Sequence, residues 1–385
     1  MYFGVQSFSF GQVPKLKLWT PKSPIIHGSV LKRLRKKKKM INTNLILIDG
    51  ISGSGKSYTA QFLAMHLQKN DSQAKWFYEH EMPHPIYQSD EVASSIEVAL
   101  RQGDGKNWRN FFKKLTYWTS ILFSHKARLT PHKIHKKALL NWEKLVSTLA
   151  GTEQVNLLES TFLQTTLGAM LTVEFDRKTM RNHLLQVQNL IKPLNPVFIY
   201  FYQNDVAAAL RKNCDRRGPA FEEYLINLIA NTPAGRKKGI KNFDELVLFF
   251  QSYKELMDFF FAELTIRKLG IENSQGDWEA YNQKISDFLS IPPLVETCNP
   301  LNPLSDLTGK YQAVKSGETL VIVTDGKKLS LDYPTKLRLF HKVDNLFCVE
   351  ATLNEISFEH NEVITKLIYR EPKPNASVLE FVKIG

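Results

Sequence analysis

One stretch of the chain combines residue types and spacing that suit phosphate binding. Residues 45–57 read LILIDGISGSGKS, in which Gly50, Gly55, Lys56 and Ser57 fit the pattern G-x-x-x-x-G-K-[ST]. In that pattern the glycines let the backbone wrap around an anion, the lysine reaches the β- and γ-phosphates, and the hydroxyl ligates Mg²⁺. We therefore expect ATP and Mg²⁺ as cofactors. The expected contacts come from Gly50, Ser52, Gly53, Ser54, Gly55, Lys56, Ser57 and Tyr58.

The flanking residues predict the strand and the helix that must position such a loop. Leu45 to Ile48 are all apolar, which is typical of a strand buried on both faces, and residues 58–68 carry apolar side chains at helical spacing. A helix that begins directly after the glycines presents its positive end to a bound anion. The alternative is an ordinary glycine turn before a helix, with Lys56 solvated.

Acidic residues follow two of the other predicted strands. Residues 74–79 predict a strand that ends on Glu79, with Glu81 close behind, and residues 154–158 predict a strand that is followed by Glu159. In open α/β sheets, ligands bind at the carboxyl ends of the strands. Glu79 is thus a candidate catalytic base or hydroxyl-orienting group, although it competes with Glu81 and could be a solvated strand end. Glu159 is a candidate for the acid near Mg²⁺.

A basic cluster lies at the end of the helix predicted over 206–214 and in the turn after it. It consists of Arg211, Lys212, Arg216 and Arg217, with a glycine following. These cations suit a lid that closes over phosphates and neutralises the charge developing during transfer. We predict catalytic roles for Arg216 and Arg217 and a cofactor contact for Arg211. A solvated helix face is the alternative.

The order of the predicted elements indicates an α/β domain with a doubly wound parallel sheet over residues 41–290. Strands are expected at 45–48, 74–79, 154–158, 197–202 and 266–271. Helices are expected at 58–68, 90–101, 108–123, 134–150, 176–191, 206–214, 221–230, 243–264 and 278–289. Alternating strands and helices predict a parallel sheet that is covered on both faces.

A second domain of a different class is predicted after a proline-rich linker at residues 291–305. Short strands are expected at 309–314, 320–323, 328–331, 336–341, 346–350, 355–359 and 363–369. Strands that recur every eight to twelve residues or so, with polar turns between them, indicate a small antiparallel barrel or sandwich. This all-β domain is predicted to span residues 306–385.

The positive charge of the chain is concentrated in its first 39 residues. The sequence has a net charge of +13, but residues 1–39 hold ten of the 51 Lys and Arg residues and no acid, which leaves 41 basic against 38 acidic residues. The body of the protein is therefore not expected to bind nucleic acid. The basic leader is expected to be disordered or absent from the native protein, with Met40 as the natural start, and a nuclear-import or polyanion-binding tail is the alternative.

The lack of a secretory signal in the leader and the wide spacing of the cysteines favour a cytoplasmic location. The leader has no apolar segment long enough for a signal peptide or a membrane span, so we expect no membrane partner. Cys214, Cys298 and Cys348 are far apart and suggest neither a disulfide framework nor a zinc site. His125, His132 and His135 fall near one another, but surface or groove positions are favoured over metal ligation.

The loop, the two strand-end glutamates and the CDRRG segment together resemble the thymidylate-kinase and deoxyribonucleoside-kinase group of P-loop kinases. The resemblance covers about residues 41–290. It is greatest to a bacterial subfamily of thymidylate-kinase-like P-loop proteins, through AKWFYE, KPLNPVFIYFYQNDV, LRKNCDRRG and KLGIENSQGDW. The stretch from 307 to 369, with LTGKYQ, DGKKLSL, DNLFCV and ISFEHNEVITKLIY, resembles the small β-barrel domain that follows some serine-β-lactamase-like proteins. That resemblance implies an accessory module without catalysis.

The kinase resemblance implies roles for individual residues. Glu79 matches the carboxylate beside the acceptor, Glu159 matches the acid of the third strand, and Arg216 and Arg217 match the lid arginines. In these kinases an arginine follows the acid of the third strand and contacts the nucleoside 5′ position. Ser160 stands in its place here, so the resemblance does not supply that contact and leaves the substrate class open. The segment 273–276 corresponds to the one near the adenine base, so Asn273 is a candidate cofactor contact.

Two classes of function remain open from the sequence. The first is an ATP- and Mg²⁺-dependent kinase that phosphorylates a nucleoside, a nucleotide or a similar small hydroxyl acceptor, or another small-molecule phosphotransferase on the same scaffold. The second is a nucleotide-dependent switch that hydrolyses slowly and binds a protein partner through its β domain. Transfer of phosphoryl from labelled ATP to an acceptor would distinguish them.

Overall fold

The computed structural model describes residues 41–70, 72–79, 81, 84–86, 131–332, 336–361, 363–371 and 378–384. The leader 1–39, the helices predicted over 90–101 and 108–123, and His125 lie outside these residues. Helix α4 contains His132 and His135, whose side chains are not among those described.

Five parallel strands form the sheet of the first domain. They are β1 (Leu45–Gly50), β2 (Ala74–Phe77), β3 (Val155–Glu159), β4 (Val197–Tyr202) and β5 (Arg267–Glu272), in the order β2-β3-β1-β4-β5. All strand pairs are parallel. The predicted doubly wound sheet is therefore confirmed. The second strand ends at Phe77, earlier than predicted, so Glu79 lies in a turn beyond it.

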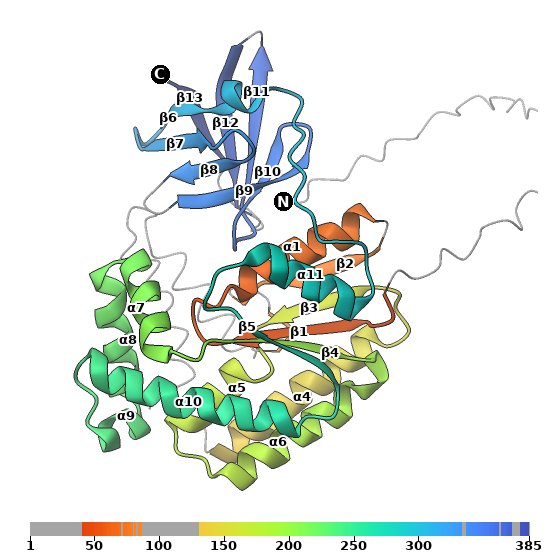
Figure 1. The fold of residues 1–385 in the computed structure, drawn as a ribbon, viewed down its shortest axis with the longest axis vertical. Helices are drawn as coiled ribbons and strands as arrows, with labels where there is room; N and C mark the ends of the chain where they lie inside the picture. The colour runs from red at the N-terminus through yellow and green to blue at the C-terminus, as the bar shows by residue number, and fades with distance from the viewer. Residues whose placement is uncertain are drawn as a thin grey trace, which may run out of the picture. The chain divides into compact units, whose positions relative to one another are not determined.

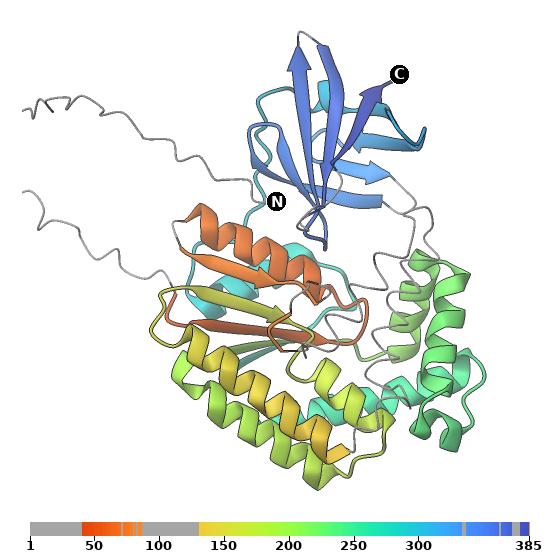
Figure 2. The ribbon, with the colours of Figure 1, turned by 180° about the vertical axis from the view of Figure 1, so that it is seen from behind.

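Helices cover both faces of this sheet (Figures 1 and 2). One face carries α1 (Lys56–Lys69) and α11 (Trp278–Leu289), which pack on Ile46 and Ile48. The opposite face packs through Leu45 and Leu47. Its helices include α4 (Pro131–Leu149), α5 (Gln164–Thr172), α6 (Arg177–Ile191) and α10 (Phe243–Glu263). Alternate residues of β1 thus enter separate cores, which explains why the whole strand is apolar until Asp49.

Three helices surround the predicted lid region. They are α7 (Val206–Arg217), α8 (Pro219–Ala230) and α9 (Pro233–Lys238). The prediction that Arg216 and Arg217 lie in a turn was wrong, because α7 continues through both and ends at Gly218, whose φ is 87°. Helices α5 and α9 were not predicted. Helix α9 begins with Thr232 as its cap and stops at Gly239, so its six residues are delimited by local signals.

The second domain is a closed antiparallel barrel of eight strands (Figure 1). The strands are β6 (Gly309–Ala313), β7 (Thr319–Thr324), β8 (Leu329–Asp332), β9 (Lys336–Val343), β10 (Leu346–Val349), β11 (Glu355–Asn361), β12 (Val363–Arg370) and β13 (Leu379–Lys383). A short helix, α12 (Leu304–Leu307), precedes them. Strand β13 was not predicted, and it closes the barrel by pairing with both β12 and β6. Buried aromatic and aliphatic side chains, among them Tyr311, Phe347 and Phe358, fill the interior.

None of the helices that the structure describes combines the length and the apolar character that a membrane span requires.

Candidate functional site

The glycine-rich loop lies where the order of the sheet reverses. It connects β1, the central strand, to α1, while the chain places β3 on one side of β1 and β4 on the other. In open α/β sheets this switch point, at the carboxyl ends of the strands, is where ligands bind. The fold therefore puts residues 51–55 at the expected position for a ligand site.

Two glycines of the loop are required by both conformation and space. Gly53 and Gly55 have φ values of 83° and 85°, in the left-handed region that favours glycine. A Cβ atom on Gly53 would lie 2.7 Å from Cγ of Asn213, and one on Gly55 would lie 2.0 Å from Cη2 of Trp278. The loop is thus packed tightly by side chains from α7 and α11, neither of which the motif reveals.

Two asparagines hold the loop from outside the motif. Asn273, directly after β5, donates from Nδ2 to the Ser54 carbonyl at 2.6 Å. Asn213 of α7 donates from Nδ2 to Oγ of Ser52 at 3.2 Å. Among the described residues, the Oδ1 atoms of both asparagines are buried without a hydrogen-bond partner. Asn273 was predicted to contact the cofactor, and here its amide supports the loop. Asn213 was not predicted.

The loop leaves several backbone donors unused. The N–H groups of Gly53, Gly55, Lys56 and Ser57 donate to no residue in the described part of the chain. Helix α1 begins at Lys56 with no acid in its first turn, so the positive end of the helix is not neutralised from within. A cluster of free N–H groups at a helix start suits a phosphate group. The residues present therefore fit the anionic ligand that the motif predicts.

Lys56 is buried beside three carboxyl groups. Its side chain is only 6% exposed, and Nζ donates to the Ile51 carbonyl at 2.9 Å. Burial lowers the pKa of Lys56, while the charges of Glu79, Glu159 and Asp49 oppose that shift. A buried cation that is bonded to the loop itself and surrounded by acids is not the solvated lysine of the alternative reading.

Glu159 faces Ser57 at the end of β3. The carboxyl is fully buried, and Oε1 accepts a long hydrogen bond of 3.4 Å from the backbone N–H of Glu79. Burial and the nearby charge of Glu79 raise the pKa of Glu159 to about 8, against a hydrogen bond from the Ser57 hydroxyl that lowers it. The structure thus brings together the hydroxyl and the acid that were predicted to lie near Mg²⁺.

Ser57 and Glu159 suit a cation whose other ligands are waters and substrate phosphates. Within the described ranges, no group of three His, Cys, Asp or Glu side chains could hold a metal ion by itself. Mg²⁺ usually keeps several waters and binds through one or two protein groups together with substrate phosphates. Ser57 and Glu159 therefore fit Mg²⁺ bound with a nucleotide better than a metal held by protein alone.

Arg217, one of the two predicted lid arginines, lies close enough to Glu79 for their charges to interact. Burial lowers the pKa of Arg217, as does the like charge of Arg216, while the charge of Glu79 raises it. The Arg217 guanidinium lies 4.6 Å from the centre of the Phe221 ring, but the residue as a whole is exposed. Arg216 is exposed in the last turn of α7.

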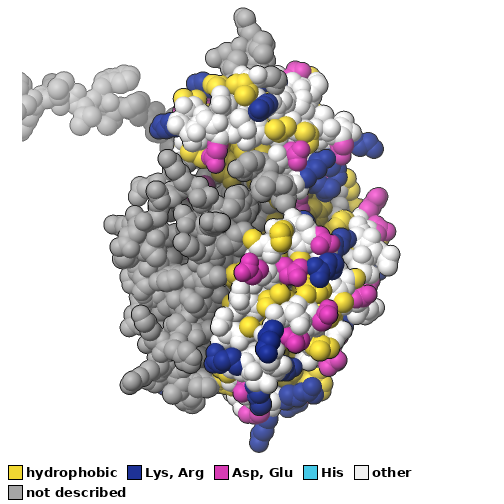
Figure 3. Space-filling view, turned by 90° about the vertical axis from the view of Figure 1, so that its left-hand side faces the viewer, with side chains coloured by type: hydrophobic (Ala, Val, Ile, Leu, Met, Phe, Trp, Pro, Cys, Tyr) yellow, Lys and Arg dark blue, Asp and Glu magenta, His cyan; other side chains and the backbone are white. Residues whose placement is uncertain are grey.

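The side chains of Arg211 and Tyr58, both predicted to contact the cofactor, interact with other residues of the protein. Arg211 forms an ion pair of 2.6 Å with Glu222 and lies 3.6 Å from the centre of the Phe243 ring. The Tyr58 hydroxyl accepts a hydrogen bond of 3.3 Å from Arg338 of the barrel, and its ring packs on Trp278 with ring centres 4.9 Å apart. The polar atom of the Tyr58 side chain therefore bonds the barrel. On the face drawn in Figure 3, Lys and Arg side chains are interspersed with Asp and Glu.

A further buried carboxyl group, that of Asp49, lies directly before the motif. Asp49, fully buried just before Gly50, accepts hydrogen bonds from the N–H groups of Phe162 at 3.1 Å, Leu163 at 2.8 Å and Gln164 at 3.3 Å. Burial raises its pKa to about 7, although these bonds and the charge of Lys56 lower it. Asp49 thereby fixes the turn after Glu159 to the strand before the loop. An acid at the end of an otherwise apolar strand was the available signal.

The fold and the site together define an α/β domain with a glycine-rich loop at its switch point, joined to an antiparallel barrel. No protein-family model matches the chain, and no curated protein is significantly similar to it in sequence.

Proposed function

We propose that this protein is a P-loop phosphotransferase that transfers the γ-phosphoryl group of ATP to a nucleoside, a nucleotide or a similar small hydroxyl acceptor. The observation that carries the proposal is the arrangement of Lys56 and Ser57 at the start of α1, beside the buried acid Glu159. Bound Mg²⁺ would neutralise charge on the phosphates. Ser57 and Glu159 are the residues that would hold it.

The chain's own residues supply the remaining requirements for transfer. The free N–H groups of the loop bind and orient the phosphates, and Lys56 adds a positive charge. Glu79 lies in the turn after β2, where it can accept a proton from the acceptor hydroxyl or orient that hydroxyl. Arg217, whose charge interacts with that of Glu79, can offset the charge that develops on the transferred group.

The kinase family that the sequence resembles supports a nucleoside or nucleotide acceptor. Ser160 in place of the arginine of that family leaves other small hydroxyl compounds as acceptors on the same scaffold. Ser160 is fully buried and has a φ of 59°, so its side chain is part of the turn that Asp49 fixes.

A panel of acceptors tests this proposal. The full chain is incubated with labelled ATP, Mg²⁺ and nucleosides, nucleotides or other hydroxyl compounds, and labelled product is measured. We expect transfer to at least one acceptor, abolished in Lys56→Ala and reduced about 100-fold or more in Glu79→Gln, since positioned acid–base groups contribute about that much. Lys178→Ala, on the exposed side of α6, is the control and should keep full activity.

A second function is favoured by one contact. Helix α1, which begins at the loop, is hydrogen-bonded to the barrel through Gln61. A nucleotide-dependent switch, in which the barrel reports the state of the loop to a protein partner, would use such a connection. ATP binding with no transfer to any acceptor in the panel would exclude the kinase proposals and favour this one.

A further inference from the structure

We propose that the barrel holds helix α1 in the position that the loop needs for nucleotide binding, so that nucleotide binding and barrel docking reinforce each other. Gln61 and Arg338 are the positioning residues. The inference rests on the proposed function in one respect, namely that the loop binds nucleotide. It gives the barrel a role within the chain, where the sequence suggested only an accessory module or a surface for a protein partner.

One face of α1 contacts the barrel and the linker before it. Tyr58, Gln61, Phe62 and Lys69 recur at spacings that bring side chains to one side of a helix. Phe62 stacks on Phe340 of β9 with ring centres 5.7 Å apart. Lys69 donates to the hydroxyl of Thr297 at 3.1 Å. The helix that carries Lys56 and Ser57 is therefore docked along much of its length.

Gln61 is the most completely bonded residue of this face. Its side chain is only 4% exposed. Nε2 donates to the carbonyls of Val349 at 3.0 Å and Thr352 at 2.9 Å, while Oε1 accepts from the N–H of Ala351 at 2.8 Å. Both ends of one amide are thus matched to a single turn of the barrel, directly after β10. Such a residue fixes the position and the rotation of the helix, beyond what apolar packing specifies.

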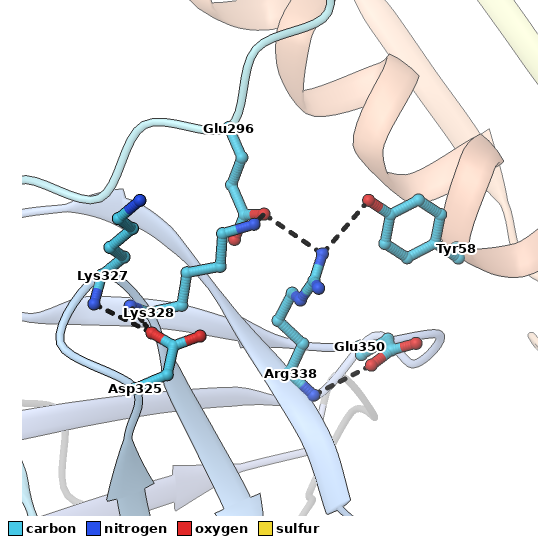
Figure 4. A network of polar contacts seen from close by, with 7 residues as sticks. All are labelled: Tyr58, Glu296, Asp325, Lys327, Lys328, Arg338 and Glu350. Carbon is cyan, nitrogen blue, oxygen red and sulfur yellow. Dashed lines mark hydrogen bonds and ion pairs between the residues drawn. The ribbon is translucent and has the colours of Figure 1, made fainter. Parts of the chain in front are cut away.

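Arg338 ties the barrel, the linker and α1 together (Figure 4). Its Nη1 lies 3.3 Å from the Tyr58 hydroxyl and 3.2 Å from Oε2 of Glu296, and the same carboxyl oxygen pairs with Lys328 at 2.7 Å. The Glu296 side chain is about one-tenth exposed, whereas those of Lys328 and Arg338 are about one-third exposed, so water screens the carboxylate less than its two cations. The contact reaches Tyr58, the residue next to Ser57.

A continuous series of packed rings leads from the barrel to the loop. Phe340, which is 1% exposed, lies 5.5 Å from Tyr58 between ring centres, and Tyr58 lies 4.9 Å from Trp278. Trp278 in turn packs so closely on Gly55 that a Cβ atom there would clash with it. Movement of the barrel away from α1 would therefore remove support from both the helix start and the loop.

Coupling of this kind is reciprocal. If docking of the barrel favours the loop conformation that binds nucleotide, then bound nucleotide must favour docking by the same factor. Changes of about 5- to 150-fold in affinity are typical of coupled sites. The barrel then acts as a module that nucleotide binding can strengthen, or that a partner could displace to weaken nucleotide binding.

The test measures the Kd of MgATP by calorimetry with the full chain. We expect Gln61→Ala and Arg338→Met each to raise Kd about 5-fold or more, with Arg338→Lys restoring part of the affinity. The matched controls are Gln68→Ala, whose amide bonds Ala74 on the sheet side of the same helix, and Lys342→Ala, which breaks an ion pair within the barrel. Both should leave Kd unchanged.

A second readout follows the reciprocal effect. Saturating MgATP should slow amide hydrogen exchange at Ala351, whose N–H is bonded to Gln61, and this protection should be lost in Arg338→Met. If Kd for the two variants equals that of the controls, or if MgATP leaves exchange at Ala351 unchanged, the inference is wrong. Failure of nucleotide binding itself would look different, because the wild type would then show no binding of MgATP by calorimetry. Failure of phosphoryl transfer alone would leave these Kd differences in place and would appear only in the acceptor panel.

Discussion

Replacement of Gly55 by alanine should destabilise the protein more than its backbone conformation alone explains. With a φ of 85°, an alanine at this position costs about 1–2 kcal/mol in the left-handed region. The added Cβ would also lie 2.0 Å from the Trp278 ring. That ring cannot move freely, since Tyr58 and Tyr281 lie 4.9 and 5.6 Å from it between ring centres. Overpacking of this kind costs about another 1–3 kcal/mol.

The chain offers a matched control for the backbone contribution. Gly151 has a φ of 78°, and no atom lies within 4 Å of its would-be Cβ. Gly151→Ala should therefore cost only about 1–2 kcal/mol, and the difference between the two variants isolates the clash. Thermal unfolding followed by circular dichroism measures both, at about 2–4 °C in Tm per kcal/mol for a domain of this size.

A double-mutant cycle identifies the source of the clash. In a Trp278→Leu background the ring atoms are gone, so Gly55→Ala should cost no more than Gly151→Ala does. Equal Tm losses for Gly55→Ala and Gly151→Ala in the wild-type background would refute the packing of Trp278 against the loop. An undiminished loss in the Trp278→Leu background would refute it equally.

Asp49 provides two further predictions. Asp49→Ala should lower the free energy of unfolding by about 2–4 kcal/mol, because three backbone N–H groups at the start of α5 lose their acceptor. The control Asp176→Ala, at the exposed start of α6, should lower it by only about 1 kcal/mol in the same denaturation assay. Equal losses for the two variants would contradict the structural role of Asp49. Because the pKa of Asp49 rises from 3.8 to about 7 on folding, the folded protein holds this proton more tightly, and its contribution to stability should fall as pH rises from about 4 to about 7. Asp49→Asn should make that part of the Tm-against-pH profile less steep, with the remaining slope coming from Glu159, whose pKa also rises, to about 8; an unchanged slope would refute the assignment.

Local sequence signals located most elements of the fold. Strand β4 and helix α11 have the predicted ends, since six consecutive apolar or aromatic residues form β4 and Asp277 caps α11. Helix α5 escaped prediction because its residues include Thr and Gly, and because the carboxylate at its start comes from Asp49, 115 residues before Gln164. Strand β13 escaped because barrel closure, and not its own short sequence, makes it a strand.

The site shows the same division between local and distant information. The motif located Gly50, Gly55, Lys56 and Ser57, because their spacing lies within eight consecutive residues of the chain. It could not reveal that Asn273 supports Ser54 across 219 residues of sequence. Nor could the motif show that the Tyr58 hydroxyl accepts a hydrogen bond from the barrel, since the donor Arg338 lies 280 residues away in sequence.

The most direct test of the account is calorimetric titration of MgATP into the full-length protein and into Lys56→Ala. The buried lysine, the free N–H groups of the loop and the pair of Ser57 with Glu159 predict saturable, Mg²⁺-dependent binding that Lys56→Ala abolishes. Absence of binding to the wild type, or equal binding to both proteins, would contradict the assignment of this loop as a nucleotide site.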